Sequence, residues 1–122
     1  MAALTFRALP IVEDEGFPQA FRLSLAGRTY QFRLYADVAE ELLDAAPGAL
    51  LDLPTAGAFL VLSVDREEAA GVTTILRRKL VPGLEYHAAE LALTFPTMRV
   101  DPRNLNGVGS FGSQVVGGVA VR

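Results

Sequence analysis

The stretch from Phe21 to Tyr35, FRLSLAGRTYQFRLY, constrains the fold more than any other part of the chain. Apolar and polar residues alternate on both sides of Ala26-Gly27, and successive side chains of a strand point to opposite faces. A two-residue connection at Ala26-Gly27 makes the two apolar faces coincide, with Phe21 opposite Phe32, Leu23 opposite Tyr30 and Leu25 opposite Arg28. Because alanine is a poor first residue for turns that need positive φ, a bulged loop using Gly27 is the alternative. Both connections predict a β-hairpin.

The totals of the chain restrict its class. Its 122 residues fit a single domain, and the net charge of -3 is spread over mixed acids and bases, which argues against nucleic acid as a main partner. Cysteine is absent, so no disulfide, thiolate nucleophile or cysteine metal site is expected, and a reducing compartment suits the chain. The first 16 residues lack the pattern of a signal peptide, and no apolar stretch approaches the roughly 18 residues that span a bilayer. We therefore expect no membrane association.

The hydrophobic content is high for a small domain. Hydrophobic residues make up 51% of the chain, and the mean hydropathy is positive. A small domain has a limited interior, and large exposed apolar patches usually mark contacts with other proteins. The composition therefore favours a protein–protein interface, although abundant alanine and valine could also account for the figure.

The remaining sequence predicts further strands. Val81-Pro82-Gly83 is a strong turn signal, and Pro96 marks an edge or a bulge. The segment 84–93 accepts either strand or helix. The run 58–64 is nearly all apolar, as in a strand that is covered on both faces. The predicted strands are 5–9 in an extended arm 1–18, then 58–64, 72–81, 94–100 and a glycine-rich C-terminal strand in 108–122, with connections at 49–57, 65–71 and 101–107.

One short helix is expected after the hairpin. Asp37 and Glu40 have the spacing of a capping box, and good helix formers follow as far as Pro47-Gly48. The helix is predicted over 38–46, with tertiary pairing able to draw part of it into a strand. Four to seven short strands with at most this one helix indicate a mainly β domain over 1–122, a small antiparallel β-sandwich or barrel.

Motifs that resemble binding sites lack the context that the chemistry needs. Gly107, Gly109 and Gly112 match G-x-G-x-x-G, but a dinucleotide site requires a helix after the glycines and an acidic residue roughly 20 positions on. Ten residues follow Gly112 and none is acidic. The triplet Glu13–Glu15 lacks the spaced oxygen ligands of a calcium loop. We expect no cofactor and no metal.

Catalytic groups are equally isolated. His87, the single histidine, has Glu85 and Glu90 nearby but no evident nucleophile, and Ser24, Ser63, Ser110 and Ser113 lie in no elbow-like motif. The bases of 77–79 alternate between the faces of a strand, so they form no single basic patch. No catalytic residue is predicted, and the chain is not expected to be an enzyme.

Two short motifs resemble a known family. Leu25 to Tyr30, a strand with a glycine-containing turn, continues into Tyr30-Gln31-Phe32-Arg33-Leu34, and Leu80-Val81-Pro82-Gly83 follows later. This order resembles the baseplate plug proteins of phage contractile tails, over about residues 19–115. The resemblance implies a non-enzymatic virion component, made in the host cytoplasm and placed near the central tail channel. It implies other baseplate proteins as partners, among them hub, spike, wedge and tube, and a symmetric homo-oligomer of three or six copies.

Two other functions are kept as alternatives. One is a small β-barrel module that binds an apolar small molecule in a cavity lined by Phe21, Leu23, Tyr30, Phe32 and Phe59. The other is an enzyme that uses His87 and a nearby acid. In the assembly hypothesis, the arm 1–18 and the tail 108–122 are the expected docking segments.

Overall fold

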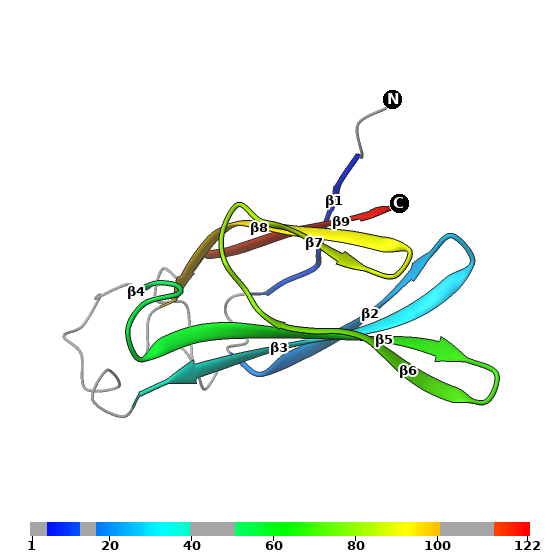
Figure 1. Cartoon of the computed structure of the whole chain (residues 1–122), viewed down its shortest axis with the longest axis horizontal. Helices are drawn as coiled ribbons and strands as arrows, with labels where there is room; N and C mark the ends of the chain where they lie inside the picture. The colour runs from blue at the N-terminus through cyan, green and yellow to red at the C-terminus, as the bar shows by residue number, and fades with distance from the viewer. Residues whose placement is uncertain (1–4, 13–16, 40–50, 101–113) are drawn as a thin grey trace.

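The computed structural model describes residues 5–12, 17–39, 51–100 and 114–122, which form two antiparallel sheets in two layers (Figure 1). One sheet has the order β1-β9-β8-β4, with β7 also paired to β8, and the other has the order β2-β3-β5-β6. The strands are β1 (Arg7–Ala8), β2 (Gln19–Leu25), β3 (Arg28–Val38), β4 (Leu51–Asp52), β5 (Ala58–Glu68), β6 (Gly71–Lys79), β7 (Glu85–Ala88), β8 (Leu91–Val100) and β9 (Gln114–Val121). The mainly β prediction is confirmed, and the sheets do not close into a barrel.

The predicted hairpin is β2–β3, and its register is the predicted one. Phe21 pairs with Phe32, Leu23 with Tyr30 and Leu25 with Arg28. Ala26 and Gly27 form a two-residue turn with φ values of 50° and 78°, so the alternative bulged loop is not used. A turn with positive φ at both central residues has the twist that antiparallel strands need.

The predicted short helix over 38–46 is wrong at its start. Val38 is the last residue of β3 and pairs with Ala58, and Asp37, the expected cap, pairs with Phe59. Cross-strand pairing with β5 therefore overrides the local helix propensity of this segment. Residues 40–46 lie outside the described residues, and the described part of the chain contains no helix. It accordingly holds no helix that could cross a membrane.

The described residues form nine strands, more than the four to seven predicted. The expected connection 65–71 is largely strand, because β5 runs on to Glu68 and β6 begins at Gly71. The ambiguous segment 84–93 resolves into β7, a turn at Ala89-Glu90 and the start of β8. Of the edge or bulge predicted at Pro96, the structure has the bulge, since the register between β8 and β9 shifts between Thr94 and Thr97.

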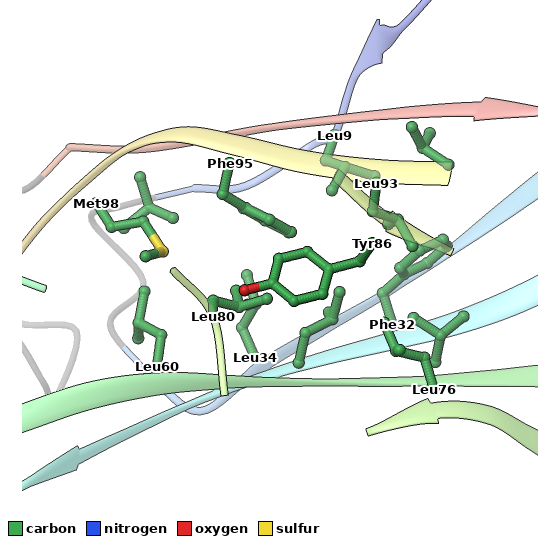
Figure 2. Close-up of a cluster of buried hydrophobic side chains, with 14 of the residues drawn as sticks. Leu9, Phe32, Leu34, Leu60, Leu76, Leu80, Tyr86, Leu93, Phe95 and Met98 are labelled. Atoms are coloured by element: carbon green, nitrogen blue, oxygen red, sulfur yellow. The ribbon is translucent and has the colours of Figure 1, made fainter. Parts of the chain in front are cut away.

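The core lies between the two sheets (Figure 2). Phe32, Leu34 and Leu60 project from the four-stranded sheet toward Leu93 and Phe95 of the other sheet, and all five are fully buried. The N-terminal segment belongs to this body, because β1 pairs with β9 and Leu9 and Phe17 are buried in the core. The described part of the predicted docking arm 1–18 is therefore packed on its own chain.

One turn between the layers is held by a buried tyrosine. The chain crosses from β6 to β7 through Leu80-Val81-Pro82-Gly83, where Leu80 is fully buried and Gly83 has a φ of 80°. The Tyr86 hydroxyl accepts a hydrogen bond from the Val81 backbone N at 2.6 Å and donates to the Lys79 carbonyl at 3.3 Å. In Figure 2 the Tyr86 ring lies among the core side chains with its oxygen beside Leu80. Tyr86 thus satisfies the backbone groups that the turn leaves unpaired.

Candidate functional site

The face of the four-stranded sheet that points away from the core carries an ordered set of side chains, here called the outer face. Register defines its rows across β3, β5 and β6. One row is Arg33–Ser63–Arg77, the next is Tyr35–Val61–Lys79, and Asp37 pairs with Phe59 beyond them. Alternation along a strand places all of these on one side, opposite the buried Leu34, Leu60 and Leu62.

The middle of the outer face is apolar and only half-buried. Tyr35, Phe59 and Val61 have intermediate exposure. The strand predicted at 58–64 is therefore fully covered on its inner face but only partly covered on its outer face. The Lys79 ammonium lies 4.9 Å from the Phe59 ring centroid, a cation–π arrangement. The outer face therefore combines aromatic surface with positive charge.

Two arginines of the outer face have no partner within the described chain. Arg33 and Arg77 make no hydrogen bond or ion pair there, and Arg7 on β1 makes none there either. The other arginines in the described ranges are engaged: Arg22 with Glu67, Arg28 with Glu90, Arg66 with Glu68 and Glu90, Arg99 with Asp52, Arg122 with the Ala89 carbonyl and Arg78 with the Tyr86 ring. Among the described residues, no acid pairs with these two positive charges of the outer face.

The three consecutive bases divide between the faces, as predicted. Arg77 pairs with Ser63 and Lys79 with Val61 on the outer face, whereas Arg78 pairs with Leu62 and places its guanidinium 5.7 Å from the Tyr86 ring centroid. The two bases that remain on the outer face combine with Arg33 from β3. Strand pairing therefore builds a basic cluster that the linear sequence does not show.

A second polar cluster joins the two sheets at the hairpin end of the molecule. This inter-sheet clasp consists of Arg28, Tyr30, Arg66 and Glu90. The Tyr30 hydroxyl donates to the Glu90 carboxylate at 2.5 Å, and Arg66 Nη1 lies 2.5 and 3.0 Å from its two oxygens. Arg28 Nη1 is 3.5 Å away. Glu90 reaches these partners from the turn between β7 and β8, so the clasp connects that turn with β3 and β5.

Electrostatics in the clasp favour a fixed charge state at neutral pH. Burial, together with the hydrogen bond to Glu90, raises the pKa of Tyr30 to about 12. Burial alone would raise the pKa of Glu90, but the Tyr30 hydrogen bond, a backbone hydrogen bond and the charges of Arg66 and Arg28 outweigh it, and the Glu90 pKa lies below its usual value. A neutral phenol and an ionised, paired carboxylate are poor proton-transfer groups near pH 7. The arrangement suits cohesion between the sheets.

Among the pockets that open on the described surface, two have an ion pair among their lining residues. The larger, of about 430 Å³, lies beside the Pro96 bulge and is bordered by Asp52, Leu53, Pro82, Met98 and Arg99. Its rim is bridged by the Arg99–Asp52 ion pair, at 2.7 Å. The smaller, of about 330 Å³, adjoins the clasp at Arg28, Arg66, Glu67 and Glu68. Each pocket has one ion pair among its own lining residues, Arg99–Asp52 in the first and Arg66–Glu68 in the second.

The five residues predicted to line an apolar ligand cavity do not surround one space. Tyr30 and Phe32 are fully buried, and the Phe21 ring stacks on Phe32 with centroids 5.2 Å apart. Leu23 packs against the same core. Phe59 lies on the outer face, because it alternates with the buried Ala58 and Leu60. These side chains fill the core or sit outside it.

Within the described ranges, His87 pairs with one acid, Glu85. Its Nε2 lies 2.6 Å from a Glu85 oxygen, both side chains are about half exposed, and Glu90 is engaged in the clasp instead. Of the serines in the described ranges, Ser63 lies on the outer face and Ser24 contacts Thr29 at 3.4 Å. Ser110, Ser113, the glycine motif 107–112 and the triplet 13–15 lie outside the described residues. The described residues hold no group of three potential metal ligands.

Comparison with known proteins returns no match: no protein-family model, no curated protein and no solved structure matches this chain.

Proposed function

We propose that the chain is a structural subunit of a phage contractile-tail baseplate, near the central tail channel, which acts by assembling with other tail proteins. The observation that carries the proposal is the outer face. Its aromatic and aliphatic centre is half-buried, and two of its arginines, Arg33 and Arg77, lack partners in the described chain. Aromatic residues and arginine are the residue types enriched in protein–protein interfaces.

The residues that resemble the plug family support the proposal through their structural roles. Tyr30, Phe32 and Leu34 are the fully buried face of β3, and Leu80 to Gly83 form the turn between the layers. These positions determine how the two sheets pack. A family that shares them would be expected to share this packing while differing on the surface.

In this proposal the chain forms a symmetric ring of three or six copies around the channel, and hub, spike, wedge or tube proteins are its neighbours. Docking uses the outer face rather than the described part of the N-terminal segment, because β1, Leu9 and Phe17 are already packed on their own chain.

The test is co-expression of the chain with the products of the reading frames that flank its gene. Affinity purification, light scattering and negative-stain microscopy of the complexes should show incorporation of several copies at the channel end of a baseplate. A chain that remains monomeric and is retained by no tail protein contradicts the proposal.

A further inference from the structure

The row Arg33–Ser63–Arg77 has the composition of a binding site for carboxylates. Ser63 on β5 pairs with Arg33 of β3 on one side and with Arg77 of β6 on the other. With strands about 4.8 Å apart, the two arginine Cα atoms are separated by about 10 Å. Their long side chains can converge over the serine hydroxyl or bind two neighbouring carboxylates.

The charge of this row favours binding of an external anion. The guanidinium groups of Arg33 and Arg77 carry the same charge on either side of β5, and neither has an acidic partner among the residues that the structure covers. Guanidinium forms its best hydrogen bonds with carboxylate or phosphate, often in a bidentate geometry. The row can therefore form charge-assisted contacts with an anion without breaking an existing pair.

The surroundings of the row distinguish a protein carboxylate from a phosphate backbone. The next row presents Tyr35 and Val61 with Lys79, and Phe59 follows, so apolar surface borders the cations. Asp37 lies at the far end of the same face, and Asp65, which accepts from Thr74 at 2.7 Å, flanks the other side. A polyanion would be repelled by these carboxylates and by the net charge of -3. A short acidic segment with apolar side chains can contact the arginines without covering the two carboxylates.

We propose that the outer face binds an acidic, partly apolar segment of a partner protein, with Arg33 and Arg77 holding its carboxylates and Tyr35 and Val61 contacting its apolar side chains. The inference rests on the proposed function for its biological setting, since it names the chemistry of the neighbouring subunit. The binding itself is a property of the isolated chain and can be measured there.

The experiment is an NMR titration of the ¹⁵N-labelled chain with the blocked peptide Glu-Leu-Glu-Leu-Glu. Saturable shifts are expected at the backbone amides of 33–35, 61–63 and 77–79 and at the side-chain Nε of the two arginines. Arg33→Gln and Arg77→Gln should each weaken binding about five-fold, as expected for the loss of a surface ion pair. Arg7→Gln removes an equally unpartnered arginine from the other sheet and should change the affinity less than two-fold.

Three results would overturn the inference. The first is absence of saturable shifts on the outer face. The second is equal binding of Lys-Leu-Lys-Leu-Lys, which would make the contact apolar only. The third is tighter binding of inorganic phosphate or an eight-nucleotide thymidine strand at the same residues, which would assign the row to phosphate. Successful incorporation into baseplates together with any of these would reject the partner chemistry and leave the proposed function standing.

Discussion

The two faces of the sheet β2-β3-β5-β6 are built from the same strands and differ in what they determine. On the inner face Phe32, Leu34 and Leu62 are fully buried. On the outer face their neighbours Arg33, Tyr35 and Val61 are exposed or half-buried. The difference separates two tasks: the inner face determines register and packing, whereas the outer face is available for contacts that the isolated chain does not make.

The outer face itself divides into a paired and an unpaired half. Near the hairpin turn, Arg22 makes two hydrogen bonds of 2.8 and 2.9 Å to Glu67, which also accepts from Gln31 at 3.2 Å. Farther along, Arg33 and Arg77 have no such acid within the described ranges. The placement of acids therefore distinguishes the two halves.

The largest expected effect comes from reversing the inner face. Phe32→Asp places a charge against the stacked Phe21 ring in a fully buried position, and we expect it to destabilise the fold by more than about 4 kcal/mol or to prevent folding. Arg33→Asp, one residue along, should change the unfolding free energy by less than about 0.5 kcal/mol. Urea unfolding followed by circular dichroism measures both. Reversed effects would mean that the faces are exchanged.

The next effect distinguishes a buried tyrosine from an outer one. Tyr86→Phe leaves the Val81 backbone N without its acceptor in the core, which should cost about 1–3 kcal/mol. Tyr35→Phe is the matched control, because Tyr35 makes no hydrogen bond with its side chain among the described residues, and it should be nearly neutral. Equal losses in thermal and urea unfolding would show that the Tyr86 hydroxyl does not support the turn.

The inter-sheet clasp should make a smaller, pH-dependent contribution to the free energy of unfolding. Glu90→Gln keeps the side-chain shape but removes the charge that pairs with Arg66, and should cost about 1 kcal/mol at neutral pH. The folded pKa of Glu90 lies below its usual value, so the ionised carboxylate stabilises the fold above the unfolded pKa. That contribution is lost as pH falls through the folded pKa.

Urea unfolding of both proteins between pH 7 and pH 3 tests the clasp. The difference between the original chain and Glu90→Gln should shrink below the ordinary carboxyl pKa of about 4.5. Glu85→Gln, which removes a half-exposed acid from the same hairpin, is the control. A difference that stays constant across this range would show that Glu90 acts through packing alone.

The fold could be predicted from the sequence where the pattern was local. The hairpin register followed from alternation around Ala26-Gly27, and the bulge followed from Pro96. The helix predicted from residue 38 was wrong because the start of that segment pairs with β5. Local helix propensity carries no information about this pairing. The short strands β1 and β4 each have two residues, too few to carry a periodic signal.

The candidate site could not be predicted from the sequence, because it too depends on pairing between distant strands. Arg33, Ser63 and Arg77 meet through the register of three strands, and they are separated by 30 and 14 positions in the chain. Correct pairing of β3 with β5 would have been enough to bring the first two together. Glu90 resembled a partner of His87 by proximity, whereas its contacts run to the other sheet.

The smallest expected effect is a gain in stability at the turn that sets which residues face inward. Ala26 has a φ of 50°, a conformation that costs an alanine roughly 1 kcal/mol and that asparagine tolerates. Ala26→Asn creates the Asn-Gly pair preferred in this turn and should stabilise the fold by about 0.5 kcal/mol. Ala20→Asn, on the outer side of β2, is the control and should give no gain. Because the turn fixes the register, a loss at Ala26 would indicate that the hairpin uses another connection and that its faces need to be reassigned.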